Sequence, residues 1–298
     1  MKPGILIGDF MKTMSLEEGV ELSSDIGYPC VELPASDMNG EGKQYSKDSS
    51  LELVDWANSL GLEITGFQCH VGYSSPDWER RVEHTKKMVD IAEHAGIPVV
   101  HTVSGILPSE AEEQQKHWLK GTKEIAKTEE WGNLLNAYRE ILEHAESKAV
   151  KVGIEPVFVY MVCNFETTKK LFDDLGRDDL YINFDPSHFP YQRESVIPFI
   201  EEFGEKIVHT HVKDATVSEL VDEEIEKGEA FSMERGEQFK FAPPGKGVLN
   251  WREILKALKG VGYDYVLSLE MGHGYEDPPE EIARENLQFV NSLLKEFS

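Results

Sequence analysis

The stretch Tyr181-Ile-Asn-Phe-Asp-Pro-Ser-His188 decides the fold, because an apolar strand pattern runs directly into an acid, a proline and a histidine. Proline donates no backbone hydrogen bond and disfavours helical backbone in the residue before it, so the strand is expected to end near Asp185. Asp185 and His188 then lie together at the exit of a strand. One Asp-Pro turn beside a histidine is more often a capped strand end than a site, so a functional interpretation requires other strands to end in the same way.

Working outward from this stretch, strand patterns alternate with helical patterns along the whole chain. The predicted strands are Ile5–Phe10, Cys30–Leu33, Glu63–Val71, Val99–Val103, Lys151–Val157, Tyr181–Asp185, Ile207–Val212 and Tyr265–Glu270. The first helix is expected to begin at Ser15, with Glu18 completing a capping box, and to end at Gly27. The other predicted helices are the segment around Leu51–Leu60, Asp77–Ala95, Gly132–Val150, Asn164–Leu175, Val196–Phe203, the segment around Asn250–Leu258, and Pro279–Phe297.

Eight strands alternating with helices predict a parallel sheet closed into a (β/α)8 TIM barrel, an α/β fold with residues 1–298 as one domain. The longest loops, at about 106–131 and 215–247, follow the fourth and seventh strands. They are therefore expected over the carboxyl-terminal face, where barrel enzymes keep their sites. A doubly wound open sheet is the competing architecture, but no G-x-G-x-x-G follows the first strand and no Walker loop occurs.

Composition limits the classes of function. The 298 residues are 40% hydrophobic and 29% charged, and their apolar runs stay well below the roughly 18 residues of a membrane span. A formal charge of −25 disfavours nucleic acid as a partner, since phosphate contacts need clustered Lys and Arg. Three scattered cysteines indicate no disulfide framework, and the N-terminus reads as a buried strand rather than a signal peptide, so a cytoplasmic location is expected.

Four predicted strands end in residues of metal-ligand type. These are Glu155 in Gly-Ile-Glu-Pro, Asp185 in Asn-Phe-Asp-Pro, His211 in His-Thr-His-Val-Lys-Asp and Glu270 in Leu-Ser-Leu-Glu-Met. Any one of them alone is more often a solvated or capping residue, but one face of a barrel would collect all four. Three carboxylates and an imidazole suit one divalent cation. Mn²⁺ is the first choice, with Mg²⁺, Co²⁺ or Zn²⁺ as alternatives.

Side-chain alternation adds further candidates. On the seventh strand His209, His211 and Lys213 share one face, which places Lys213 near substrate oxygens and makes His209 a deeper packing residue. His70 and His101, at the ends of the third and fourth strands, are candidates for substrate contact. The alternative for both, as polar fillers of the barrel mouth, stays equally open.

From about residue 151 to 272 the chain resembles the xylose isomerase-like TIM barrel superfamily of sugar phosphate isomerases and epimerases, and is similar to ketose 3-epimerases and hydroxypyruvate isomerase. The resemblance lies in ordered motifs: Glu-Pro, Asp-Pro-Ser-His, His-Val-Lys-Asp, Gly-Lys-Gly-Val-Leu-Asn-Trp and a final strand-end Glu. It implies that Glu155, Asp185, His211 and Glu270 bind the metal, that Glu155 and Glu270 are the catalytic acid–base pair, and that His188 contacts a substrate oxygen. Those epimerases carry an arginine where Val217 stands here, which leaves the substrate open.

The expected activity is that of a metal-dependent isomerase or epimerase of carbohydrate metabolism, acting on a small sugar or sugar derivative. Removing a weakly acidic C–H proton beside a carbonyl needs a cation that stabilises the enediolate and carboxylates that move the proton. One alternative is a lyase on the same metal site, similar to keto-inositol dehydratases or C-glycoside-cleaving enzymes. A nuclease similar to endonuclease IV is a weaker one, because the 215–247 excursion contains no histidine. The sequence leaves the oligomeric state open, with a homo-oligomer as one alternative, since barrels of this kind often pair.

Overall fold

The computed structural model describes residues 1–35, 45–106, 125–158, 160–218, 239–272 and 275–297. Eight parallel strands close into a barrel in the order β1-β10-β7-β6-β5-β4-β3-β2. They are β1 (Lys2–Leu6), β2 (Cys30–Pro34), β3 (Glu63–Gln68), β4 (Val99–Val103), β5 (Lys151–Glu155), β6 (Leu180–Phe184), β7 (Ile207–Val212) and β10 (Val266–Leu269). The predicted (β/α)8 barrel is confirmed.

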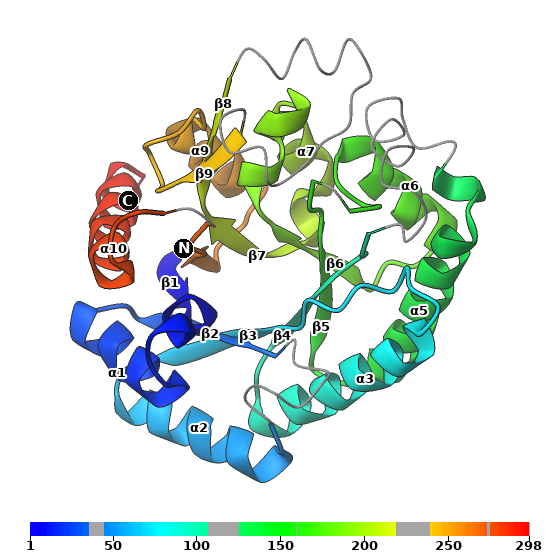
Figure 1. Cartoon of the computed structure of the whole chain (residues 1–298), viewed down its shortest axis with the longest axis horizontal. Coiled ribbons are helices and arrows are strands. Elements are labelled where there is room, and N and C mark those ends of the chain that lie inside the picture. The colour runs from blue at the N-terminus through cyan, green and yellow to red at the C-terminus, as the bar shows by residue number, and fades with distance from the viewer. Residues whose placement is uncertain (36–44, 107–124, 159, 219–238, 273–274, 298) are drawn as a thin grey trace.

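Helices follow the strands and surround the barrel (Figure 1). They are α1 (Leu16–Ile26), α2 (Lys47–Ser59), α3 (Trp78–Ala95), α5 (Glu129–Ala145), α6 (Phe165–Leu175), α7 (Val196–Phe203), α9 (Trp251–Gly260) and α10 (Pro279–Glu296). At α1 the predicted capping box is present: the Glu18 amide donates to Ser15 Oγ (3.1 Å) and the Ser15 amide donates to Glu18 Oε2 (2.8 Å). Gly27 ends α1 with a φ of 103°, a left-handed conformation that suits glycine.

The first strand is shorter than predicted. The prediction extended it to Phe10, but β1 ends at Leu6 and Ile7–Lys12 form a 3-10 helix. Ile7 and Phe10 are nevertheless fully buried. The prediction that this apolar run is buried was correct, and the prediction that it is a strand was wrong. A short apolar run does not distinguish a buried strand from a buried helical segment.

The barrel strands are buried on both faces, as expected for parallel strands covered by helices. Apolar side chains fill the layer between strands and helices, whereas the interior of the barrel also holds buried polar side chains. These include Glu32, Thr65, His101, Asn183, His209, His211 and Ser268. A polar interior of this kind is expensive unless its members pair with one another, and it indicates a site.

The two predicted excursions fall partly outside the described residues, at 107–124 and 219–238. In the second, β8 (Asp214–Val217) pairs antiparallel with β9 (Phe239–Ala242). Asp214 stabilises this two-stranded ribbon of β8 and β9. Its carboxylate accepts hydrogen bonds from the amides of Ala215 (2.8 Å), Gly245 (3.1 Å) and Leu249 (3.1 Å). The ribbon therefore starts directly after Lys213, one of the candidate site residues.

Among the described residues, no helix combines the length and the apolar character needed to cross a bilayer.

Candidate metal centre

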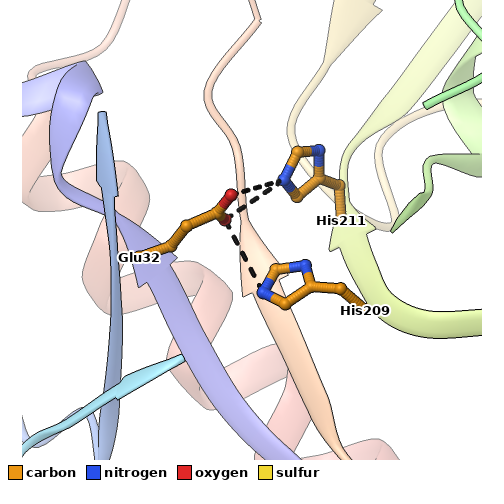
Figure 2. A group of neighbouring side chains, drawn as sticks. All are labelled: Glu32, His209 and His211. Atoms are coloured by element: carbon orange, nitrogen blue, oxygen red, sulfur yellow. Dashed lines mark hydrogen bonds and ion pairs between the residues drawn. The ribbon is translucent and has the colours of Figure 1, made fainter. Parts of the chain in front are cut away.

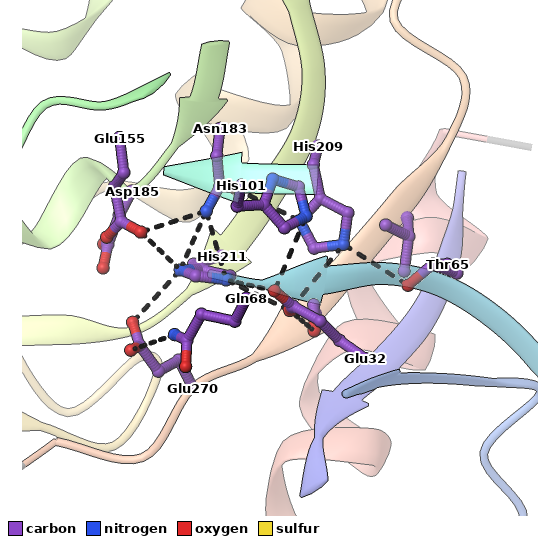
Figure 3. Close-up of polar contacts among 12 residues, drawn as sticks. Glu32, Thr65, Gln68, His101, Glu155, Asn183, Asp185, His209, His211 and Glu270 are labelled. Carbon is purple, nitrogen blue, oxygen red and sulfur yellow. Dashed lines mark hydrogen bonds and ion pairs between the residues drawn. The ribbon is translucent and has the colours of Figure 1, made fainter. Parts of the chain in front are cut away.

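Residues of metal-ligand type form two adjoining groups inside the barrel. One group is buried deep in it and consists of Glu32, His209 and His211 (Figure 2). The other lies at the carboxyl ends of the strands and consists of Glu155, Asp185, His211 and Glu270 (Figure 3). In each group one ligand atom per residue lies within 4.8 Å of those of the others. The second group contains all four residues that the sequence predicted as ligands.

Local structure aims Asp185 into this group. It follows β6 and precedes Pro186, and its Oδ1 accepts a hydrogen bond from the Ser187 amide (2.8 Å), which caps the 3-10 helix Pro186–His188. The cap leaves Oδ2 to face the site, 2.8 Å from Lys213 Nζ. The Asp-Pro turn is therefore both a strand end and a device that orients a carboxylate.

Glu155, the last residue of β5, is fully buried and surrounded by donors. Asn183 Nδ2 donates to its Oε2 (3.0 Å), and His70 Nε2 lies 3.0 Å from the same oxygen. His188 Nε2 lies 3.3 Å from Oε1 of Glu155 and 3.3 Å from Oδ2 of Asp185. His70 and His188, both predicted to contact substrate, thus border the four-residue group.

Glu270 directly follows β10 and, like Glu155, faces Nδ1 of His211. Its Oε2 accepts from Lys213 Nζ (2.6 Å) and lies 3.1 Å from His211 Nδ1, while Gln68 Nε2 donates to Oε1 (3.1 Å). Lys213 bridges Glu270 and Asp185 from a position that is only 5% exposed. The structure places Lys213 beside the four-residue group, and its contact with substrate oxygens stays a prediction.

The charged residues of the group shift the pKa values of one another. Burial raises the pKa of Glu155, but His211 and His70 outweigh it and hold that pKa well below its usual range. Burial also raises the pKa of Glu270, and Lys213 and His211 again outweigh it, so the net shift is downward. In turn, Glu270, Glu32 and Glu155 overcome the opposing effect of burial and raise the pKa of His211 well above its usual value.

These residues fit a divalent cation. Three carboxylates converge with one imidazole in a buried site, where like charges repel strongly unless positive charge lies between them. Oxygen ligands with one nitrogen ligand suit Mn²⁺, Mg²⁺ or Zn²⁺, and the described residues place no cysteine in either group.

His101 lies apart from the four-residue group. It is fully buried, its ring centroid is 4.2 Å from that of His209, and its Nε2 is 3.5 Å from Glu32 Oε1. Gly66 makes room for it, since a Cβ at that position would come within 2.8 Å of His101 Nε2. The contact of His101 with substrate stays a prediction, while its contacts in the structure belong to the deeper group.

Sequence reasoning missed four residues that the structure brings to the site: Glu32, Gln68, Asn183 and Asp9. The sequence could have identified Glu32 as a candidate, because it is an acidic residue in the middle of Cys30–Pro34, a strand of otherwise apolar residues. Asp9 was hidden inside the overextended first strand. Its Oδ2 accepts from the Met271 amide (2.6 Å), next to Glu270.

Asp9 gives a test of these electrostatics. Burial and the charge of Glu270 raise its pKa from 3.8 to about 7, so near pH 5 the native carboxyl keeps a proton that the unfolded chain has lost. Native stability from this group is therefore lost as pH rises through 7. Between pH 5 and 8 this group is expected to lower the free energy of unfolding by about 3 kcal/mol. In chelator-treated protein, Asp9→Asn should remove this part of the pH dependence, measured by urea unfolding at both pH values. A free energy of unfolding that changes with pH as much in Asp9→Asn as in the wild type would contradict this account of Asp9.

Aromatic side chains line the mouth beside His188. The Phe158 ring lies 5.3 Å from the His188 ring and 4.8 Å from Phe239, and the Phe241 ring lies 5.7 Å from His188. Lys213 Nζ sits 4.5 Å from the centre of the Phe241 ring. Strand β9 thus supplies an apolar wall next to the polar group, an arrangement that suits a small molecule with both polar and apolar faces.

Comparisons with known proteins agree with this architecture. A family model described as xylose isomerase-like TIM barrel matches residues 20–293. An inosose dehydratase of Glaesserella parasuis serovar 5 (strain SH0165) is 28% identical over 148 residues, which are 48% of this chain and 47% of that protein. The chain thus spans about half the length of the curated relatives that head the comparison.

Two solved structures show the same fold. The IolI protein with a bound zinc atom has a TM-score of 0.74 at 18% identity, covering 100% of this chain and 99% of its own. L-ribulose 3-epimerase has a TM-score of 0.68 at 17% identity, covering 99% of this chain and 94% of its own. At these identities the likeness shows the fold alone.

Proposed function

Because the chain belongs to the xylose isomerase-like TIM barrel family, we propose that it is a divalent-metal-dependent enzyme that isomerises or epimerises a sugar or sugar derivative. The observation that carries the proposal is the convergence of Glu155, Asp185, His211 and Glu270 at the carboxyl ends of four barrel strands. These four residues would hold one cation, with Mn²⁺ as the first candidate. The zinc atom of the IolI protein supports a divalent ion in this fold.

A divalent cation held there supplies electrostatic stabilisation of the negative charge that develops on substrate oxygens when a C–H proton is removed. Glu155 and Glu270 move the proton. Both carboxyls have a lowered pKa and are ionised near neutral pH, so either is ready to accept a proton. Both lie at Nδ1 of His211, Glu155 at the end of β5 and Glu270 just after β10. In this proposal one of them takes a proton from one face of the substrate and the other returns it to the opposite face.

Lys213 and His188 would hold substrate oxygens. Lys213 is buried between Asp185 and Glu270, which raise its pKa well above the usual value against the effect of burial, so it is a constant positive charge. His188 lies between Glu155 and Asp185 and is 5% exposed. His70, at 22% exposed, is the most open of the three histidines considered for substrate contact.

Dehydration of a cyclic keto-polyol is the second candidate. It is favoured by the names of the curated relatives, since that from Glaesserella parasuis and one from Serratia proteamaculans (strain 568) are both inosose dehydratases. The first step, removal of a proton beside a carbonyl, is shared with isomerisation and uses the same carboxylates. The two activities differ in whether the carbanion is reprotonated or expels a hydroxyl group.

A solvent-deuterium exchange screen separates these outcomes. The Mn²⁺-loaded protein is incubated in D₂O with ketoses, keto-inositols and hydroxypyruvate, and each sample is followed by NMR. We expect label at C3 of a ketose for an epimerase, label at C1 or C2 for an isomerase, and loss of a substituent for a dehydratase. Glu155→Gln serves as the inactive control. An absence of exchange and of product with every compound would contradict the proposal.

A further inference from the structure

A layer of buried polar side chains lies directly beneath the candidate metal centre. Glu32 of β2 projects toward His209 and His211 of β7 (Figure 2). All three side chains are fully buried, and the carboxylate of Glu32 contacts no member of the four-residue group except His211. A buried carboxylate at this depth is costly unless it is paired, so its place calls for an explanation.

The two nitrogens of His211 face different carboxylates, while Nδ2 of Asn183 lies near both, 3.5 Å from Nδ1 and 3.3 Å from Nε2. Nδ1 lies 3.1 Å from Glu270 Oε2 and 3.6 Å from Glu155 Oε2, on the side of the metal centre. Nε2 lies 3.1 Å from Glu32 Oε2, on the side of the buried layer. A neutral imidazole carries a proton on one nitrogen and a lone pair on the other, so the partner of Nε2 decides whether Nδ1 is free to bind a cation.

Glu32 is itself held in place. Ser268 Oγ donates to its Oε2 (3.0 Å), and His101 Nε2 lies 3.5 Å from its Oε1. Ser268 and His211 are direct neighbours across β10 and β7, so both reach the same carboxylate oxygen. These contacts fix the position of Glu32 Oε2 opposite His211 Nε2.

A second cation between Glu32, His209 and His211 is the competing interpretation, since their ligand atoms also lie within 4.8 Å. The hydrogen bonds disfavour it. Asn183 uses its Nδ2 on Glu155 and presents Oδ1 to His209 Nδ1 (3.1 Å), so Nδ1 of His209 donates there. The remaining nitrogen of His209 lies 3.4 Å from Thr65 Oγ1 but 3.8 Å from Glu32. His209 therefore has partners without a cation.

We propose that Glu32 is a positioning residue for the metal centre: it accepts a hydrogen bond from Nε2–H of His211 and so keeps the Nδ1 lone pair directed at the cation site. The inference rests on the proposed function, because it assumes that His211 is a ligand. Carboxylates that orient metal-binding histidines in this way contribute substantially to affinity.

The test measures metal binding rather than turnover. Metal-free wild type, Glu32→Gln and the control Glu63→Gln are titrated with Mn²⁺ by calorimetry. Glu63 is a suitable control because it lies at the start of the neighbouring strand β3 and pairs with Lys2 on the surface. We expect Glu32→Gln to raise Kd roughly 10- to 100-fold with one ion still bound per chain, and Glu63→Gln to leave Kd unchanged.

A second measurement needs no variant, in case Glu32→Gln does not fold. In Zn²⁺-loaded wild type, ¹⁵N NMR of the His211 ring should show a proton on Nε2 and none on Nδ1. The opposite tautomer, or an unchanged Kd in Glu32→Gln, would overturn the inference while wild-type binding left the proposed function standing. Two ions per wild-type chain and one in Glu32→Gln would also overturn it, making Glu32 a ligand. A wild type that binds no ion would instead remove the proposed function itself.

Discussion

Glu155→Gln and Glu270→Gln are each expected to lower kcat by about 10³-fold or more while the protein stays folded. Glutamine keeps the size of glutamate but neither accepts a proton nor offers a negative oxygen to a cation. Each change therefore removes a proton-transfer group and a proposed ligand at once. The backbone of Glu155 is unchanged in Glu155→Gln, and the glutamine side chain still offers an amide oxygen to Asn183 Nδ2, so the fold is expected to persist.

The measurement is turnover of whichever compound the deuterium screen identifies, together with circular dichroism and the melting temperature of each variant. Glu140→Gln is the matched control, since Glu140 pairs with Lys86 on the outer helices α5 and α3. It should keep full activity. Turnover near the wild-type rate in both Glu155→Gln and Glu270→Gln would show that neither carboxylate moves the proton.

Metal affinity is expected to fall steeply as the pH is lowered. In the metal-free protein, neighbouring carboxylates raise the pKa of His211 well above its usual value, so a proton occupies this imidazole near neutral pH. A cation that uses Nδ1 must displace that proton. The carboxyl groups of Glu155 and Glu270 have lowered pKa values and release none in this range. Below the pKa of His211, the apparent Kd should therefore rise about tenfold for each pH unit lost.

Calorimetric titration with Mn²⁺ at pH 6, 7 and 8 checks this slope, and buffers of different ionisation enthalpy count the protons released. We expect a weaker Kd at pH 6 than at pH 8, and protons released as the ion binds. Chelation should abolish turnover, and added Mn²⁺ should restore it. A Kd that is independent of pH would mean that His211 releases no proton when the ion binds, and the proposed ligand set would then be wrong.

The fold and the four-residue group could be predicted from the sequence because their signals are local. An apolar strand pattern followed by Glu-Pro or Asp-Pro predicts where the strand ends and which residue lies at its end. Parallel strands in a barrel then bring these ends together. Asp185 and Glu155 are clear cases, since a proline follows each of them.

The buried layer could not be predicted in the same way, because its contacts join residues far apart in the chain. Glu32 and His211 are separated by 179 positions and meet only when the barrel closes. His101 was expected at a strand end, but it is the third of five residues in Val99–Val103, and an inward residue in the middle of a strand lies below the mouth. The first strand was overextended because Ile7 and Phe10 are buried in either conformation.

The most direct test of the central claim is anomalous diffraction from crystals grown with Mn²⁺. The account predicts one strong anomalous peak per chain, about 2.0–2.5 Å from a carboxylate oxygen of Glu155, Asp185 and Glu270 and from Nδ1 of His211. A peak bound elsewhere, or four side chains that stay paired with Lys213 and one another while no ion is present at saturating Mn²⁺, would contradict it.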